Sequence, residues 1–207
     1  MLTAERIAAQ RGGVTLVANV EFALGPGEAL IVTGANGSGK TTLLRMVAGL
    51  TEPHLGQLSW RSAPVNPFDR RLRAATLYIG HAAALKDEFS AAENLRSLAG
   101  LHDAIPDPQA VRAALDEWSL GRHADIPARV LSQGQRRRVA LARMSLTRRH
   151  LWVLDEPATA LDASGIATLE KRIDAHMAQH GIAVIAIHQP LALAGATRKL
   201  ELRPAPR

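Results

Sequence analysis

Residues 34–41 read Gly-Ala-Asn-Gly-Ser-Gly-Lys-Thr, and this stretch decides the fold. The pattern Gly-x-x-x-x-Gly-Lys-Thr is typical of a loop that binds phosphate. Glycines let successive backbone N–H groups curl around an anion, and the positive end of the following helix adds to the attraction. We therefore expect a nucleoside triphosphate, ATP, to be bound by Gly34, Ala35, Asn36, Gly37, Ser38, Gly39, Lys40, Thr41 and Thr42.

Two of these side chains have a specific expected role. Lys40 should reach the β- and γ-phosphates, and the hydroxyl of Thr41 should join the shell of Mg²⁺. The sequence around the loop agrees, because residues 28–33 form a short apolar run and residues 41–50 have the spacing of an amphipathic helix. A strand, a glycine-rich turn and a helix are the context that a phosphate loop needs.

The rest of the chain continues to alternate strands and helices. Asp162 could cap a helix that runs over residues 163–180 and ends at Gly181. Residues 90–150 are expected to be mainly helical, with breaks at Pro106, Pro108 and Pro127. Such alternation predicts a mostly parallel sheet that is covered on both faces. The further strands are expected at residues 56–60 (half of a hairpin), 75–80, 151–154 and 182–187.

Two carboxylates follow the apolar run Leu151-Trp152-Val153-Leu154. Ligands bind at the carboxyl ends of strands in open α/β sheets, so Asp155 and Glu156 are expected beside the phosphate loop. We assign Asp155 to Mg²⁺ and Glu156 to the orientation and polarisation of the attacking water. An ordinary strand that ends in an acidic turn is the alternative for this motif taken alone.

Bulk composition limits the class of protein. The 207 residues suffice for one sizeable α/β domain, and the absence of cysteine excludes a disulfide framework and a thiolate metal site. We expect no secretory signal in residues 1–11, and no apolar run is long enough to cross a bilayer. The net charge of +6 favours contact with nucleic acid or an anionic membrane face, or only a solvated basic surface.

The pentapeptide Leu131-Ser132-Gln133-Gly134-Gln135 precedes another helical run. By itself it could be no more than a helix cap. Together with the two motifs above, it resembles the signature sequence of ATP-binding-cassette (ABC) proteins, from which it departs at Gln133. The resemblance covers about residues 5–190 and implies that the Ser132 hydroxyl and the Gly134 amide face the γ-phosphate held by a second subunit. It also implies that Gln135 belongs to the nucleotide-binding residues.

The same resemblance assigns further site residues. Asp162 lies in a match to the D-loop, and His188 matches the switch histidine that contacts the γ-phosphate. Arg11 falls where an aromatic side chain usually stacks on adenine, and a guanidinium plane can also stack on a base. His81 replaces the usual Q-loop glutamine. Glu156, His188 and Lys40 are thus the expected catalytic residues, and the metal ligands are Thr41 and Asp155.

The resemblance also implies a fold class. It is α/β: a P-loop NTPase ABC ATPase core with a mixed sheet, an antiparallel β subdomain and an inserted helical subdomain. A single ATP-binding domain would fill residues 1–207, with the helical subdomain at about residues 82–150.

Several short strings resemble one branch of the family, the ATP-binding subunits of the cytochrome c maturation (haem export) transporters of Gram-negative bacteria and mitochondria. The strings are Tyr78-Ile79-Gly80-His81, residues 92–95, residues 132–143 and His188-Gln189-Pro190, although that branch usually has glutamine where this chain has Ala82. The branch implies an ATPase that drives haem export or delivery for c-type cytochrome maturation.

Its implied partners are a second identical ATPase subunit, an integral membrane transporter subunit of the haem exporter B type and further cytochrome c maturation membrane proteins, without nucleic acid. The implied location is peripheral, on the cytoplasmic face of the bacterial inner membrane. The alternatives are the ATPase of another ABC transporter and a soluble ABC ATPase associated with nucleic acid or ribosomes.

Two motifs remain outside this assignment. His176 and His180 have a spacing that can bind a metal or haem iron, but no third ligand is evident, so we expect an ordinary structural pair. The run Arg136-Arg137-Arg138 places positive charge near a helix N-terminus, where it is unfavourable. Acidic neighbours or phosphate could compensate this charge, but a solvated face is the interpretation that we favour for the run.

Overall fold

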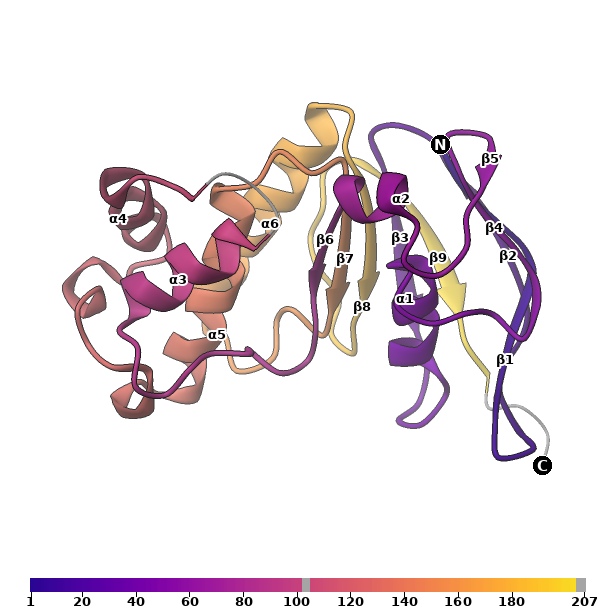
Figure 1. Cartoon of the computed structure of the whole chain (residues 1–207), viewed down its shortest axis with the longest axis horizontal. Coiled ribbons are helices and arrows are strands. Elements are labelled where there is room, and N and C mark those ends of the chain that lie inside the picture. Colours follow the sequence, from indigo (N-terminus) through magenta and orange to yellow (C-terminus); the bar gives the residue numbers. More distant parts are fainter. Residues whose placement is uncertain (102–104, 204–207) are drawn as a thin grey trace. The chain divides into compact units, whose positions relative to one another are not determined.

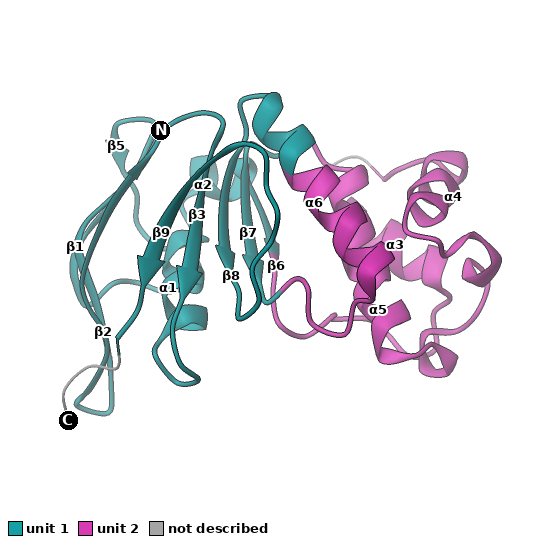
Figure 2. Ribbon diagram, turned by 180° about the vertical axis from the view of Figure 1, so that it is seen from behind, with its two compact units in different colours: residues 1–78, 149–156, 174–207 teal, residues 79–148, 157–173 magenta. Residues whose placement is uncertain are grey.

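Figure 1 shows the computed structural model of the chain, which describes residues 1–101 and 105–203. The chain divides into two compact units, coloured in Figure 2. Unit 1 comprises Met1–Tyr78, Arg149–Glu156 and Asp174–Arg207, and unit 2 comprises Ile79–Arg148 and Pro157–Ile173. The helical subdomain expected at about residues 82–150 stays a prediction, and its residues 102–104 lie outside the described residues.

Unit 1 contains a four-stranded antiparallel sheet with the order β2-β1-β4-β5. Both long strands carry irregularities in their pairing, and Arg6 and Asn19 take a positive φ there. These irregularities bend the sheet locally. The strands are β1 (Leu2–Arg11), β2 (Val14–Leu24), β4 (Leu55–Trp60) and β5 (Ala63–Pro64).

The second sheet of unit 1 has five strands in the order β6-β7-β8-β3-β9. β3 pairs in parallel with β8 and β9, and β7 pairs in parallel with β8. Every residue of β7 and β8 is buried, which explains their continuous apolar sequences. The strands are β3 (Glu28–Thr33), β6 (Thr76–Ile79), β7 (Leu151–Asp155), β8 (Ile182–Ala186) and β9 (Ala196–Glu201).

Helix α1 (Lys40–Val47) lies between the two sheets of unit 1 (Figure 1). It contacts β7 and β8 on one side and β2 on the other, and Leu43, Leu44 and Val47 are completely buried. A short helix, α2 (Arg70–Ala75), begins at the capping side chain of Asp69. One apolar core thus joins both sheets through α1 and fixes the start of α1 against the strand ends.

Unit 2 is helical. Its α-helices are α3 (Ala91–Gly100), α4 (Pro108–Glu117), α5 (Gln133–Leu141) and the first part of α6 (Ala163–Ala178). Short 3₁₀ turns connect them: η1 (Gly121–His123), η2 (Ala128–Val130) and η3 (Ala142–Ser145). The expected break at Pro106 and Pro108 is confirmed, because α3 ends at Gly100 and α4 begins only at Pro108. Pro108 follows the cap Asp107 as the first residue of the helix, where a missing N–H costs nothing.

Helix α6 confirms Asp162 as its cap, since the Asp162 carboxylate accepts a hydrogen bond of 2.8 Å from the Gly165 N–H. Its end differs from the expectation. His180, not Gly181, takes the left-handed conformation (φ 62°) that closes the helix. Gly181 is needed for another reason: a Cβ there would lie 2.2 Å from the His176 ring.

Together, an antiparallel sheet, a parallel sheet and a helical unit give the α/β architecture expected from the sequence. Among the described residues, none of the helices has the length and apolar character to cross a membrane.

Candidate nucleotide-binding site

The glycines of the loop between β3 and α1 are required by close contacts. Gly34 has a φ of 147°, and a Cβ there would lie 2.5 Å from the Leu202 carbonyl oxygen. Gly39 has a φ of 94°, and its Cβ would meet the Leu16 carbonyl oxygen at 2.4 Å. A side chain fits neither position, so the loop keeps a tight curve of the kind in which backbone N–H groups can converge on an anion.

Lys40 is buried, with 7 % of its side chain exposed, and it contacts four groups. Its Nζ donates to the carbonyl oxygen of Gly34 at 2.9 Å and lies 3.3 Å from that of Ala35. It also lies 3.3 Å from His188 Nε2 and 3.8 Å from Glu156 Oε1. The ammonium group is therefore held over its own loop, beside the groups expected to act on the γ-phosphate.

The expected metal ligands meet. Thr41 Oγ1 donates to Asp155 Oδ2 at 2.9 Å, although the two residues are 114 positions apart. Asp155 is 1 % exposed at the carboxyl end of β7. The negative charge of Asp155 also acts on Tyr78: burial is the main cause that raises the pKa of the Tyr78 hydroxyl, and the charge of Asp155 raises this pKa further. A hydroxyl oxygen and a carboxylate oxygen that lie side by side are ligands that Mg²⁺ accepts when phosphate oxygens complete its coordination shell.

The described residues hold no group of three or more His, Cys, Asp or Glu side chains that could bind a metal alone. The donor set therefore fits Mg²⁺ bound together with a nucleotide, and it does not fit a metal cage made only of protein ligands.

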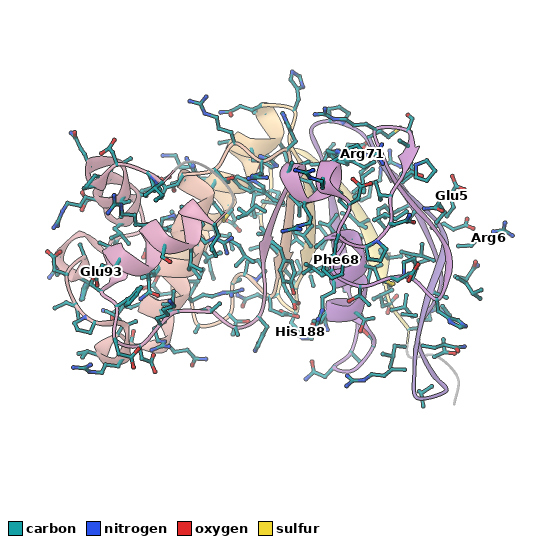
Figure 3. The ribbon with its side chains drawn as sticks, in the orientation of Figure 1. Glu5, Arg6, Phe68, Arg71, Glu93 and His188 are labelled. Atoms are coloured by element: carbon teal, nitrogen blue, oxygen red, sulfur yellow. The ribbon has the colours of Figure 1, made fainter. Side chains whose placement is uncertain are left out.

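Glu156 has an unusual backbone. Its φ is 51°, while its N–H donates to the Ala186 carbonyl oxygen on β8 at 2.9 Å. Such a conformation in a residue other than glycine is uncommon and is found often at functional sites. It turns the side chain toward His188, whose Nε2 lies 3.0 Å from Glu156 Oε1. Half of the His188 side chain is exposed, and Figure 3 shows it where β8 ends.

A cavity of about 750 Å³ lies beside α1 in unit 1. Arg11 lines it together with Thr42 and Arg45, and none of its lining residues is Phe, Tyr or Trp. Glu52 and His54 close another part of its wall. The cavity has room for a base next to the phosphate loop, so the role of Arg11 at adenine stays a prediction that this geometry allows.

The signature residues lie in unit 2 at the start of α5. Ser132 is the N-cap, and its hydroxyl and the Gln135 side chain bond each other's backbone N–H groups, at 3.2 and 2.8 Å. A Cβ on Gly134 would lie 2.6 Å from the Ala160 carbonyl oxygen, so the expected D-loop packs directly on this glycine. Ser132 is exposed, and its hydroxyl accepts from the Gln135 N–H but keeps its own hydrogen, which it can donate to an anion.

The arginine run does not form a solvated face. Arg136 pairs with Asp87 at 2.6 Å and Arg138 with Asp162 at 2.5 Å, so acidic neighbours compensate these charges. Arg137 is 4 % exposed and donates to backbone carbonyls, among them those of Gly80 and Pro157. The prediction that acidic neighbours compensate the charge is confirmed for Arg136 and Arg138. The prediction of a solvated side chain is wrong for Arg137, which is buried.

Two histidine predictions have different outcomes. His176 is buried and stacked on Trp152 with ring centroids 3.8 Å apart, and its Nε2 lies 3.2 Å from the Ile182 carbonyl oxygen. His180 is exposed, so of the two histidines only His176 has the structural role that we expected of the pair. His81 is exposed in unit 2, and its carbonyl oxygen accepts from Arg137 at 3.3 Å. The role of its imidazole stays a prediction.

Comparison with known proteins gives both a family and a group of relatives. Residues 17–159 match the ABC transporter family. The chain is 46 % identical over 188 residues to a Cupriavidus necator protein named cytochrome c biogenesis ATP-binding export protein CcmA, covering 91 % of this chain and 83 % of the relative. A protein of the same name from Nitrosomonas europaea is 40 % identical and covers 95 % and 92 %.

Solved structures agree in fold. A putative ABC transporter ATP-binding protein from Pyrococcus furiosus superposes with a TM-score of 0.81 at 20 % identity, over 96 % of both chains. An ATP-binding cassette in a dimeric post-hydrolysis state with ADP and Pi gives a TM-score of 0.78 at 22 % identity, over 91 % of this chain and 88 % of the other.

Proposed function

Because the chain belongs to the ABC transporter family, we propose that it is the ATP-hydrolysing subunit of a transporter that serves the maturation of c-type cytochromes by haem export or delivery. The observation that carries the ATPase part is the convergence, in unit 1, of Lys40, Thr41, Asp155, Glu156 and His188. The names of the relatives support the transport part.

In the proposed reaction, the loop amides and Lys40 bind the triphosphate. A phosphate oxygen replaces the carbonyl oxygens of Gly34 and Ala35 as the partner of the Lys40 ammonium, and a charged acceptor makes a stronger bond than a neutral one. Glu156 then exchanges its contact with Lys40 for the attacking water, which it orients and deprotonates. His188, already within 3.0 Å of Glu156, holds the γ-phosphate beside that water.

Thr41 and Asp155 would hold Mg²⁺, whose charge neutralises that of the phosphates. The Asp155 carboxylate would then accept the cation in place of the Thr41 O–H, whose proton stays on Thr41, and burial of Asp155 would keep the carboxylate in position. The protein contributes position and charge in this reaction, because phosphoryl transfer to water needs little covalent assistance.

The proposed unit is a homodimer. One chain carries one phosphate loop and one signature segment, and a symmetric pair allows each ATP to meet the loop of one copy and Ser132 of the other. The exposed cap at Ser132 supports this arrangement, since it can bond an incoming phosphate oxygen. The transport role further implies a membrane subunit on which this pair acts from the cytoplasmic face of the membrane.

The transport role is tested by complementation. In Cupriavidus necator without its own relative of this chain, the wild-type chain should restore covalently bound haem on c-type cytochromes, seen by haem staining of membrane proteins. Lys40→Ala should fail to restore it at equal protein level. Restoration of haem by Lys40→Ala, or failure of a wild-type chain that hydrolyses ATP and is recruited to the membrane, would contradict the transport assignment.

A further inference from the structure

The arginines at positions 137 and 138 of α5 touch both ends of the segment that contains the D-loop match, residues 157–164. At one end, Arg137 Nε donates to the Pro157 carbonyl oxygen at 3.2 Å. At the other end, Arg138 NH2 bonds Asp162 Oδ1 at 2.5 Å and Ser164 Oγ at 3.0 Å. All of these residues belong to unit 2.

The middle of the segment is held by shape. Ala160 has a φ of 62°, and its carbonyl oxygen lies so close to Gly134 that a Cβ there would be 2.6 Å away. The segment therefore rests on the first turn of α5, which begins at the exposed cap Ser132. Three successive contacts, at residues 157, 160 and 162, fix its path along the signature helix.

The guanidinium groups of Arg137 and Arg138 can each bond several oxygen atoms of the surrounding chain. Arg137 is 4 % exposed, and a planar group with five donors can bond several carbonyl oxygens at fixed angles. It also donates to the Gly80 carbonyl oxygen at 2.8 Å, which joins the residue before His81 to the same group. Arg138 has 12 % of its side chain exposed and donates to the Trp118 carbonyl oxygen at 3.2 Å.

The surroundings of Asp162 favour the ionised form of its carboxyl group. Hydrogen bonds from the Gly165 N–H and the Ser164 hydroxyl lower the pKa of its carboxyl, and the charge of Arg138 lowers it further. The carboxylate thus caps α6 and holds Arg138 at the same time. A change at the Arg138 guanidinium is therefore transmitted to the start of α6 and to the backbone before it.

We propose that Arg137 and Arg138 are positioning residues that hold residues 157–164 against the signature helix, so that Ser132 and Asp162 meet a second copy of the chain as one rigid surface. This inference rests on the proposed function, because the surface acts on ATP only in the dimer. It assigns the arginine run a part in hydrolysis that involves no contact with the nucleotide. Nucleotide binding itself depends on unit 1, so it should not respond to these residues.

The test uses Arg138, because a buried Arg137 variant can fail to fold. Arg138→Met should lower kcat by about fivefold, as expected for the loss of one partly exposed ion pair, and should leave the Kd for ATP unchanged. Arg138→Lys should recover part of the kcat, since an ammonium can still reach Asp162. The control is Arg112→Met on α4, which removes an exposed arginine that pairs with Asp125 in the same unit.

Hydrogen exchange gives a second readout that does not need activity. The amides of residues 158–165 should exchange at least about fivefold faster in Arg138→Met than in Arg112→Met, because local opening no longer breaks the guanidinium bonds. Asp162→Asn should lower kcat less in the Arg138→Met background than in the wild type. Equal exchange in the two methionine variants, or additive effects on kcat, would overturn the inference.

The two proposals fail in different ways. If the wild-type chain does not hydrolyse ATP, the proposed function is wrong, while the exchange comparison still decides whether Arg138 holds the segment. If the wild type hydrolyses ATP and Arg138→Met does so at the rate of the control, only the positioning role is wrong.

Discussion

In unit 1 the candidate functional groups contact one another, whereas in unit 2 Ser132 and Gln135 bond each other's backbone at the start of one helix. Lys40, Glu156 and His188 come from three distant parts of the chain and lie within 4 Å of each other. Ser132 and Gln135 are three residues apart and cap the same helix. Unit 1 thus holds an assembled set of charged side chains that folding brings together, and unit 2 presents an exposed helix start.

The largest effect is expected from Glu156→Gln, which keeps the shape of the side chain but removes the base. ATP hydrolysis should fall by about 100-fold to 10,000-fold, the range for loss of a general base. ATP should still bind, so the variant should accumulate as a dimer on size exclusion with ATP. Glu21→Gln, an exposed glutamate on β2, is the control. A normal rate in Glu156→Gln would remove Glu156 from the assembled set.

Lys40→Ala comes next, with an effect on binding. The affinity for ATP should fall by about 100-fold, because bonds from an ammonium to phosphate oxygens are lost. Titration with a fluorescent ATP analogue measures this change. Lys171→Ala, an exposed lysine on α6, should bind as the wild type does. Unchanged affinity in Lys40→Ala would refute the assignment of the loop at residues 34–41.

Two capping boxes in unit 2 permit a matched comparison. Ser132 and Ser90 cap α5 and α3 with the same reciprocal bonds, so Ser132→Ala and Ser90→Ala should each cost about 1 kcal/mol of stability. Only Ser132→Ala should also lower hydrolysis, by about tenfold, since it removes a donor to a charged phosphate. Thermal unfolding and steady-state ATPase rates measure the two effects. Equal rates in both variants would mean that Ser132 is only a cap.

The smallest effect concerns a polar contact of unit 1 outside the nucleotide site. The Arg71 guanidinium is the main cause that lowers the pKa of Asp69 from 3.8 to about 2. Because the folded pKa lies below the unfolded one, this contribution to stability is complete above pH 3.8 and is lost as the pH falls toward 2. The difference in Tm between the wild type and Asp69→Asn should therefore shrink over this window.

Arg71→Met leaves the cap at Asp69 but removes the guanidinium, so it should reproduce most of that loss of pH dependence. Both variants should hydrolyse ATP at the wild-type rate at neutral pH. A constant Tm difference between wild type and Asp69→Asn from pH 5 to pH 2.5 would contradict the assigned cause.

The sequence alone was sufficient to predict the features that depend on interactions between neighbouring residues. The loop at residues 34–41, the buried strands beside it and the cap at Asp162 all follow from glycine freedom, apolar runs and short-range hydrogen bonds. Strand β9 was not predicted, because an edge strand with the sequence Ala-Thr-Arg-Lys-Leu-Glu has no apolar run to reveal it. The strands β1 and β2 were not predicted individually either.

Tertiary structure decided which distant groups meet. The 2.9 Å bond between Thr41 and Asp155 and the 3.0 Å contact between Glu156 and His188 depend on strand order in the sheet, which no local pattern encodes. The environment of Arg137 also depends on tertiary structure. Its charge predicts a solvated side chain, but in the folded chain it is buried and donates to carbonyl oxygens of two other segments. The kinds of chemical group and their local backbone conformation follow from the amino-acid sequence, because these depend on neighbours within a few residues. Their partners depend on packing between segments up to about 150 residues apart, and only the tertiary structure fixed those.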